Sequence, residues 1–315
     1  MMATKKKNAK IGNKKVAAKK PLSKGFGSTK SVATVAIPTC KLNTGVSVPV
    51  LCFGTYKCDG AELKQALESA IAAGYRHYDT ARAYRNEAIV GAAILESGIP
   101  REEFFITSKL WGSDHGEQRA RQAIEASLSE LGTYLDCLLI HGPDNSGNSP
   151  EETIALRQQT WSVMEEQHAA GSLRAIGVSN FEPRHIESIL ACGSVTPAIN
   201  QIECHAYLAQ PEIRAFCADR GILVEAFGSV GAAGLRADPV VQQIASSHKR
   251  SPAQISLRHT LQSGRGAVVL AKSLTPKRIL DNTKLFDFEL SKDECAALDA
   301  LDAGKRSYWD NSQVP

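Results

Sequence analysis

A carboxylate, a phenol, an ammonium group and an imidazole each lie at or just after the end of a short, mostly apolar segment of this chain. They belong to Asp79, Tyr84, Lys109 and His141. A free phenol, with a pKa of about 10, is too weak an acid to protonate a substrate readily at neutral pH. A neighbouring lysine favours the phenolate and lowers that pKa, and a carboxylate can pair with the lysine. The four groups therefore predict proton delivery to a carbonyl oxygen while another group delivers hydride.

From about residue 50 onward, the chain alternates between strand-like and helix-like patterns. Leu63, Leu67 and Ile71 recur at the spacing of an amphipathic helix, as do Ala66 and Ala70. The expected strands, each short and mostly apolar, are 50–56, 75–80, 104–110, 135–141, 175–179, 198–203, 222–227 and 267–272. The expected helices between and after them are 63–71, 86–96, 118–131, 151–170, 183–191, 211–219, 239–249, 276–282 and 292–301.

Eight such strand–helix units predict an α/β fold, the closed (β/α)8 TIM barrel. The turn-forming residues 42–45 within 37–49 predict a β-hairpin that caps one end of the barrel. Barrel active sites lie at the carboxyl ends of the strands, where the four chemical residues fall. The predicted division is a basic extension over residues 1–36 and a barrel over residues 37–315.

The charge of the chain is unevenly distributed. Of 37 lysines and arginines, ten are lysines within residues 1–30, a stretch that contains no acidic residue. The remaining 27 basic residues face 33 acidic ones, so the body is mildly acidic and is not expected to bind nucleic acid. Three interpretations of the extension stay open: a solvated disordered segment, a targeting peptide, or a contact with a polyanion or membrane surface.

The composition also indicates the cellular compartment of the protein. The eight cysteines are scattered among apolar neighbours without a C-x-x-C pair, which favours reduced thiols in the cytoplasm over disulfides or a metal site. No apolar run approaches the roughly 20 residues of a transmembrane helix. We expect a cytoplasmic monomer.

Several long motifs in order resemble the aldo-keto reductase family, over about residues 42–301. They are GYRHYDTA at 74–81 followed by YRNE at 84–87, LLIH at 138–141, AIGVSNF at 175–181, and LAKSLTPKR at 270–278. The resemblance implies that Tyr84 protonates the carbonyl oxygen, that Lys109 lowers the pKa of Tyr84, and that Asp79 holds Lys109. It implies that His141 orients the carbonyl group, while hydride comes from a reduced nicotinamide. Tyr56 and Trp111 are the expected walls of the substrate pocket.

The resemblance also implies a cofactor site. Ser179, Asn180 and Gln201 correspond to the partners of the nicotinamide carboxamide, and Phe227 to the aromatic residue stacked on its ring. The remaining positions that it assigns to the cofactor are Thr55, Lys272, Ser273, Arg278, Asp281 and Asn282. Because a cluster of lysine, serine and arginine suits a phosphate dianion, NADPH is expected rather than NADH.

The pocket departs from the family pattern. Gly142 stands where the family often has a tryptophan, and Gly228 where a serine contacts the pyrophosphate. Only 14 residues follow Leu301, so the substrate-selecting loop is short. A wider or differently filled pocket with loose specificity is expected.

The predicted function is NADPH-dependent reduction of aldehydes and ketones. One alternative is a cofactor-binding barrel that serves as a regulatory or scaffolding subunit, but this requires a damaged tetrad and all four residues are present. A metal-dependent hydrolase is disfavoured because the sequence shows no His/Asp set with ligand spacing.

Overall fold

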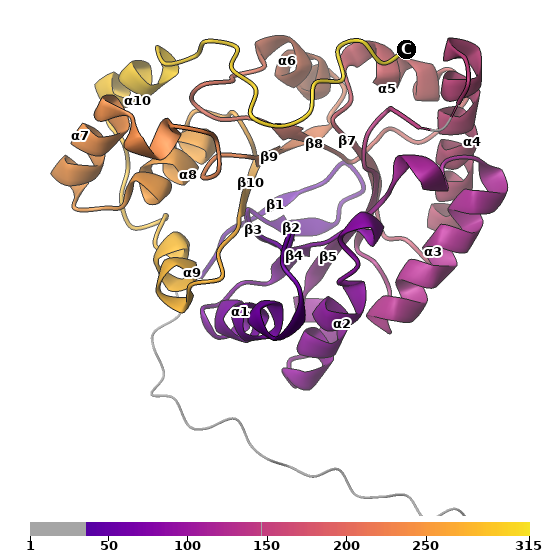
Figure 1. Cartoon of the computed structure of the whole chain (residues 1–315), viewed down its shortest axis with the longest axis horizontal. Helices are drawn as coiled ribbons and strands as arrows, with labels where there is room; N and C mark the ends of the chain where they lie inside the picture. The colour runs from indigo at the N-terminus through magenta and orange to yellow at the C-terminus, as the bar shows by residue number, and fades with distance from the viewer. Residues whose placement is uncertain (1–35, 146) are drawn as a thin grey trace, which may run out of the picture. The chain divides into compact units, whose positions relative to one another are not determined.

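The computed structural model describes residues 36–145 and 147–315. Within this part of the chain, eight parallel strands close into a barrel in the order β10-β3-β4-β5-β6-β7-β8-β9 (Figure 1). Their bounds are β3 Leu51–Gly54, β4 His77–Asp79, β5 Phe105–Leu110, β6 Cys137–Ile140, β7 Ile176–Ser179, β8 Ile199–Glu203, β9 Leu223–Phe227 and β10 Val268–Ala271. The predicted TIM barrel is confirmed, with strands one to three residues shorter than expected.

Ten helices of the described residues accompany the barrel. They are α1 Gly60–Ala72, α2 Glu87–Glu96, α3 Glu117–Leu131, α4 Pro150–Ala169, α5 Pro183–Leu190, α6 Pro211–Asp219, α7 Pro239–His248, α8 Pro252–Gln262, α9 Pro276–Thr283 and α10 Lys292–Asp299. None of these helices is long and apolar enough to cross a membrane. The predicted extension 1–36 lies outside the described residues except for residue 36, so the domain boundary stays a prediction.

Helix α8 was missing from the sequence prediction, although its start signals are present. The Ser251 hydroxyl accepts from the Gln254 backbone, the Gln254 side chain reaches back to Ser251, and Pro252 occupies the first turn. The prediction placed one helix after each strand, so it missed the second helix between β9 and β10. Its buried face, which includes Ile255 and Leu257, packs toward the barrel beside α7 and α9.

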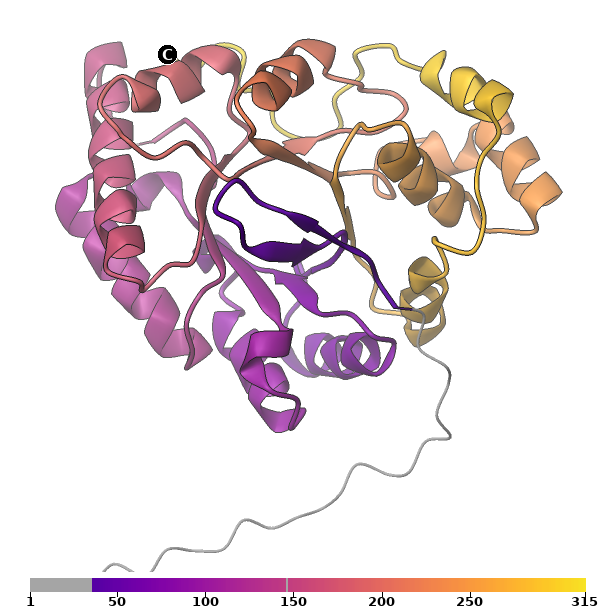
Figure 2. The same ribbon diagram turned by 180° about the vertical axis from the view of Figure 1, so that it is seen from behind.

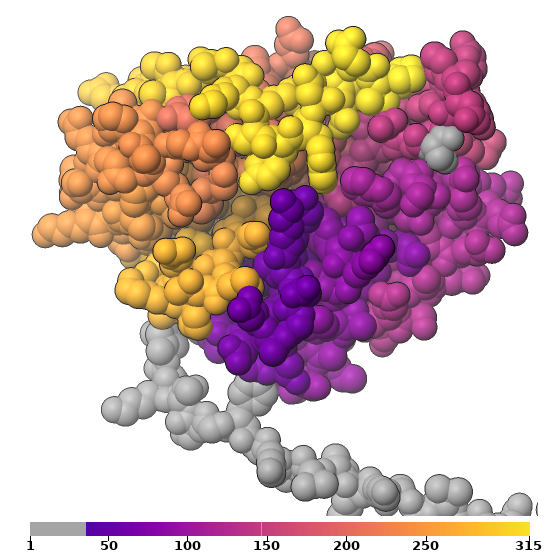
Figure 3. Space-filling view, in the orientation of Figure 1, coloured from indigo at the N-terminus to yellow at the C-terminus, as the bar shows by residue number. Residues whose placement is uncertain are grey.

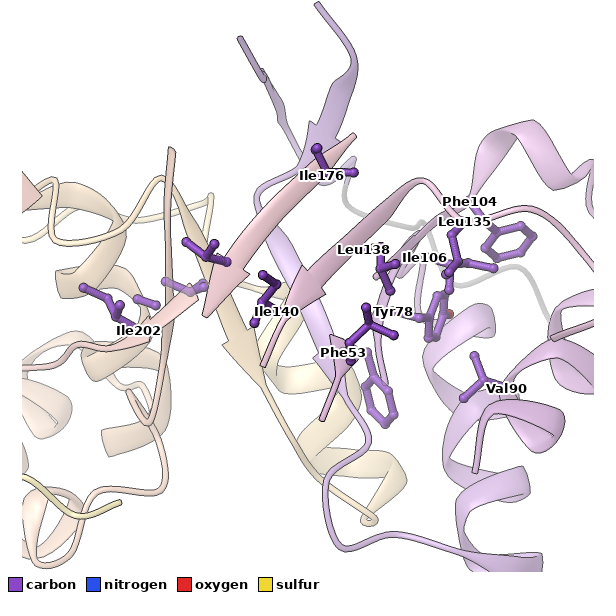
Figure 4. Packing of buried hydrophobic residues seen from close by; sticks show 14 of the residues in the cluster. Phe53, Tyr78, Val90, Phe104, Ile106, Leu135, Leu138, Ile140, Ile176 and Ile202 are labelled. Atoms are coloured by element: carbon purple, nitrogen blue, oxygen red, sulfur yellow. The ribbon is translucent and has the colours of Figure 1, made fainter. Parts of the chain in front are cut away.

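Side chains alternate along each strand, so one set faces the helices and the other fills the barrel. The outward set includes Phe53, Tyr78 and Ile106, which pack against the helices (Figure 4). The rings of Phe53 and Tyr78 lie 6.0 Å apart. The inward set at the strand ends carries the polar residues of the site.

The predicted hairpin is confirmed as β1 (Thr39–Lys41) paired antiparallel with β2 (Ser47–Pro49). Gly45 turns the chain at a φ of 81°, a left-handed conformation that favours glycine. Leu42 and Val48 are buried together with Phe105 and Val268, which lie at or near the amino ends of their strands. The hairpin therefore closes that end of the barrel (Figure 2), and only the opposite end is left for a site.

Candidate active site

The carboxyl ends of the strands bring the four predicted chemical groups together. Asp79 ends β4, Lys109 is the penultimate residue of β5, and His141 directly follows β6. Tyr84 is carried by η1 (Arg82–Tyr84), a single 3-10 turn between β4 and α2. The buried Asn86 side chain fixes this turn, because its amide donates to the Thr55 and Cys58 carbonyls. A phenol is thus placed over the barrel end by a short, tightly bonded connection.

A buried ion pair lies at the centre of the group. Lys109 Nζ donates to both Asp79 carboxylate oxygens at 2.6 Å and to the Thr80 carbonyl at 3.0 Å. The same Nζ lies 3.4 Å from the Tyr84 hydroxyl. Lys109 is 0% exposed and Asp79 2% exposed, so the pair is shielded from solvent. The arrangement directs a positive charge at the phenol oxygen.

Burial controls the protonation states. It raises the pKa of Tyr84, the Lys109 ammonium lowers it in part, and the resulting pKa is about 12. The lysine thus acts in the predicted direction, but burial outweighs it. Burial would lower the pKa of Lys109, yet the Asp79 carboxylate and Tyr84 more than offset this and raise it. Tyr84 is therefore a phenol, and Lys109 an ammonium ion, at neutral pH.

The imidazole of His141 completes the group. Its Nε2 lies 3.5 Å from the Tyr84 hydroxyl, and its ring centroid lies 5.6 Å from that of Tyr84. Burial, together with the Lys109 charge, lowers the pKa of His141 well below its usual value. The ring is therefore neutral and can donate only one hydrogen bond.

Polar side chains of β7 and β8 extend the site across the barrel. Gln201 Nε2 donates to Asp79 at 2.8 Å, and Ser179 Oγ donates to the Gln201 carbonyl at 2.8 Å. Asn180 has a φ of 61°, and its amide donates to the His141 carbonyl at 2.9 Å. A non-glycine residue in this conformation stores strain that the surrounding bonds must offset. Gln201 and Asn180 therefore contact the chemical group directly, and Ser179 contacts it through Gln201.

A cationic rim lies at the amino end of α9. Lys272, Ser273, Lys277 and Arg278 all face the same cavity, and Lys272 Nζ donates to the Tyr56 carbonyl at 3.0 Å. Backbone N–H groups at a helix start add to the positive potential there. Asp281 faces the cavity too, but it is paired with Lys277 at 2.6 Å and Lys284 at 3.1 Å. The rim therefore keeps an excess of positive charge.

One cavity of about 910 Å³ connects the chemical group with the cationic rim. Its lining includes most of the predicted site residues: Tyr56, Asp79, Tyr84, His141, Ser179, Asn180, Gln201, Phe227, Lys272, Ser273, Arg278, Asp281 and Asn282. Three of the predicted site residues do not line the cavity. Lys109 lies beneath Asp79 and Tyr84. Thr55 is fully buried and donates to the Asp79 carbonyl, and Trp111 lies beside the cavity with its ring 4.9 Å from that of His141.

The C-terminal segment supplies residues that sequence reasoning missed. The Trp309 ring lies 5.5 Å from His141, 5.9 Å from Trp111 and 6.3 Å from Tyr56. Tyr308 packs edge-on against Phe227 at 5.5 Å. Figure 3 shows the C-terminal part of the chain, in yellow, beside an indigo part from near the start of the barrel. No motif in the sequence includes Tyr308 or Trp309. Their aromatic side chains were the one feature that could have singled them out.

A buried carboxylate anchors this segment. Glu203, 2% exposed, accepts from the Ser307 and Tyr308 backbone N–H groups at 2.8 and 3.2 Å, and from His205 Nε2 at 2.9 Å. Further along, Arg184 donates to the Ser312 carbonyl at 2.8 Å. These bonds place Tyr308 on the Phe227 side of the cavity and Trp309 on the His141 side.

Comparison with known proteins gives the family. The model of the aldo/keto reductase family matches residues 50–303. The chain belongs to the aldo/keto reductase family. It is 43% identical to an aldo-keto reductase of Mycolicibacterium vanbaalenii, over 87% of this chain and 95% of that protein. It is 40% identical to a glyoxal reductase of Bacillus subtilis, over 85% and 94% respectively.

Solved structures agree with this assignment. An aldo/keto reductase from Brucella melitensis is 40% identical, with a TM-score of 0.79 over 85% of this chain and all of that chain. An aldo-keto reductase from a deep-sea metagenome is 32% identical, with a TM-score of 0.81 over 88% of this chain. This aldo/keto reductase family member is therefore an oxidoreductase that acts on carbonyl groups.

The two glycines that depart from the family pattern both lie near the C-terminal segment of this aldo/keto reductase. The nearest atom to a side chain at Gly142 would be Asn311 Nδ2, at 3.9 Å, so the C-terminal segment lies where the family indole is absent. Gly228 has a φ of 84°, and a Cβ there would come within 3.4 Å of the Tyr308 ring. Trp309 lines the cavity beside His141, and the wider or differently filled pocket expected from Gly142 stays a prediction.

Proposed function

We propose that this chain is an NADPH-dependent reductase of aldehydes and ketones, with Tyr84 as the proton donor. The observation that carries the proposal is the buried Asp79–Lys109 pair, whose ammonium nitrogen lies 3.4 Å from the Tyr84 hydroxyl in the wall of a single cavity. The opposite end of that cavity is cationic. A proton-delivery group and an anion site within one cavity suit a substrate carbonyl and a phosphorylated cofactor.

The residues present fit an extended dinucleotide. The cavity of about 910 Å³ is at the upper end of the usual range for ligand sites. Ser179, Asn180 and Gln201 would hold the carboxamide and Phe227 would stack on the nicotinamide, while Asn282 would contact the adenine. Lys272, Ser273 and Arg278 would hold a 2′-phosphate through charge-assisted hydrogen bonds. When bound, the reduced nicotinamide supplies hydride.

The proton step belongs to Tyr84. As the carbonyl carbon is reduced, charge develops on the carbonyl oxygen, and the phenol proton moves to that oxygen. Lys109 stabilises the phenolate that remains, and Asp79 keeps the ammonium group in place. Because this pair is preorganised and buried, its field costs no reorganisation during the reaction.

His141 would orient the substrate. Its neutral ring donates one hydrogen bond and adds no net charge beside Lys109. The Tyr84 hydroxyl and His141 Nε2 are 3.5 Å apart, so both can contact one carbonyl oxygen between them.

The test is oxidation of NADPH by the purified protein with a panel of small aldehydes, ketones and dicarbonyls, followed by identification of the alcohol. We expect aldehydes to be turned over faster than ketones. NADPH binding without turnover of any carbonyl would instead favour the alternative of a regulatory or scaffolding subunit.

Replacing Arg278 with alanine is expected to weaken NADPH binding about 10- to 100-fold, because a hydrogen bond to a charged group contributes about 1.5–3 kcal/mol. NADH binding should change less than about twofold, since NADH lacks the 2′-phosphate. Dissociation constants are measured by fluorescence titration. The control is Arg250→Ala, which removes a cation that pairs with Asp287 rather than facing the cavity. Equal weakening of both cofactors by Arg278→Ala would contradict the 2′-phosphate assignment.

Replacing Trp309 with alanine is expected to raise KM for aromatic aldehydes about tenfold, because the substrate loses an aromatic partner. The value of kcat should stay within about threefold, since Trp309 packs beside His141 and not against Tyr84, the proton donor. Trp309→Phe, which keeps a ring, should lie between wild type and Trp309→Ala. A tenfold fall in kcat with unchanged KM would rule out this role.

We also propose a cytoplasmic location and a monomeric state. The eight cysteines, all within the described residues, are free thiols, as a reducing compartment allows. Measuring mass by light scattering, and distribution by cell fractionation, tests both expectations.

A further inference from the structure

A second carboxyl group is buried inside the barrel beneath the Asp79–Lys109 pair. It belongs to Glu225 of β9, a strand residue that is 0% exposed. Within the described residues, neither carboxyl oxygen of Glu225 has a well-formed hydrogen bond, although the Cys52 thiol and the Gln201 amide approach the carboxyl group. An ionised carboxylate is strongly disfavoured when it is buried without a partner, so burial favours the neutral form of Glu225.

The nearest titratable neighbours do not form a metal site with Glu225. Cys52 Sγ, a His77 ring nitrogen and a Glu225 oxygen lie within 4.8 Å of one another. However, His77 Nδ1 bonds to the Pro49 carbonyl and Nε2 to Thr107 Oγ1, both at 3.1 Å, so the ring has no free nitrogen. Burial also raises the pKa of the Cys52 thiol, which keeps the sulfur protonated. This cluster therefore offers neither a free imidazole nor a thiolate.

The charged groups around Glu225 lie on two neighbouring strands of the barrel. Asp79 on β4 repels a negative charge on Glu225, and Lys109 on β5 attracts it. The remaining groups that face it are neutral: His77 on β4, Gln201 on β8, and the thiols of Cys40, Cys52 and Cys137. Since Asp79 already pairs with Lys109 through both oxygens, an ionised Glu225 would be an unpaired second carboxylate.

Burial and the neighbouring charges decide the protonation state of Glu225. Burial is the largest cause and raises the pKa of Glu225, and the Asp79 carboxylate raises it further. Lys109, the Cys52 thiol and the Gln201 amide lower it only in part, and the resulting pKa is about 8. A glutamate in an unfolded chain has a pKa of about 4.3. The folded barrel therefore retains a proton that the unfolded chain releases.

We propose that Glu225 stores a proton inside the barrel and acts as a positioning residue for the Asp79–Lys109–Tyr84 group. This proposal rests on the proposed reductase function for its kinetic part. While Glu225 is neutral, the Lys109 ammonium interacts electrostatically with the Asp79 carboxylate and the Tyr84 phenol alone. Proton loss places a second negative charge beside Lys109, which makes Tyr84 a weaker acid and reduces turnover.

The first test is the stability of the cofactor-free protein and needs no activity. Because the folded pKa is raised, the stabilisation is complete below about pH 4.3 and is lost progressively as pH rises toward 8. In that window the unfolding constant contributed by Glu225 grows about tenfold per pH unit. Urea unfolding of Glu225→Gln, which keeps the shape and removes the proton, should lack this component. Identical pH slopes for the two proteins would overturn the stored proton.

The second test is kinetic. Wild-type kcat for aldehyde reduction should fall about tenfold between about pH 7.5 and 9.5, while Glu225→Gln should show no fall with a midpoint near 8. If both proteins show the same profile, Glu225 does not act on Tyr84. If neither reduces any carbonyl, the proposed function fails, and the unfolding test still decides the protonation of Glu225.

An infrared titration of the wild-type protein keeps the proposal falsifiable if Glu225→Gln does not fold. A buried carboxylic acid has a carbonyl stretch that disappears on ionisation. We expect such a band to titrate with a midpoint near pH 8. Glu87 is a second buried carboxyl group with a raised pKa, but it accepts hydrogen bonds from Ser108 and Ser127, which lower that pKa in part. Absence of any carboxylic acid band that titrates near pH 8 would overturn the proposal.

Discussion

Replacing Tyr84 with phenylalanine is expected to lower kcat/KM for NADPH-dependent aldehyde reduction by about 10³-fold, because proton transfer by a positioned side chain contributes about 10²–10⁴-fold. The change removes one oxygen from a ring that stays packed against Tyr56 and His141. NADPH binding should change less than about twofold, because the carboxamide and phosphate partners are untouched. Steady-state kinetics and fluorescence titration measure the two effects.

A matched control removes a phenol oxygen away from the cavity. Tyr134 lies before β6, at the hairpin end of the barrel, with its ring 3.9 Å from the Arg101 guanidinium. Tyr134→Phe should retain kcat/KM within about twofold. Activity of Tyr84→Phe close to wild type would contradict its role as proton donor, and loss of NADPH binding would show that the change disturbs the cofactor site instead.

The sequence predicted the chemical group because parallel barrels impose a simple rule. Strand ends meet at one mouth, so Asp79, Lys109 and His141 could be placed together from their positions in the chain alone. The distances and protonation states could not be predicted. The pKa of Tyr84 depends on burial by the whole mouth, and burial outweighs the lysine that local reasoning singled out.

Features made by contacts between distant parts of the chain escaped prediction. Trp309 lies beside His141 in a segment that Glu203, more than 100 residues away in sequence, holds at the backbone of Ser307 and Tyr308. Glu225 looked like an ordinary strand residue, since the inward side of β9 becomes apparent only when the barrel closes. Thr55 shows the limit of a position matched to the family. The resemblance placed Thr55 at the cofactor, but its buried hydroxyl donates to the Asp79 carbonyl.

Replacing Lys109 with methionine is expected to reduce the free energy of unfolding by about 3–5 kcal/mol, because it leaves Asp79 as a buried, uncompensated charge. Turnover should also fall at least about 100-fold, because the phenolate of Tyr84 loses its neighbouring cation and the pKa of Tyr84 rises further. Urea unfolding and aldehyde-dependent NADPH oxidation measure the two effects. A variant with wild-type stability would contradict the buried pair.

The double variant Asp79→Asn/Lys109→Met separates stability from catalysis. Neutralising both partners leaves no buried charge, so most of the lost unfolding free energy should return. Turnover should stay as low as in Lys109→Met, because Tyr84 still lacks an ammonium ion 3.4 Å from its hydroxyl. If turnover recovers together with stability, Lys109 serves only to hold the barrel together. If stability alone recovers, the positive charge itself acts on the phenol, and Asp79 contributes by keeping that charge in place.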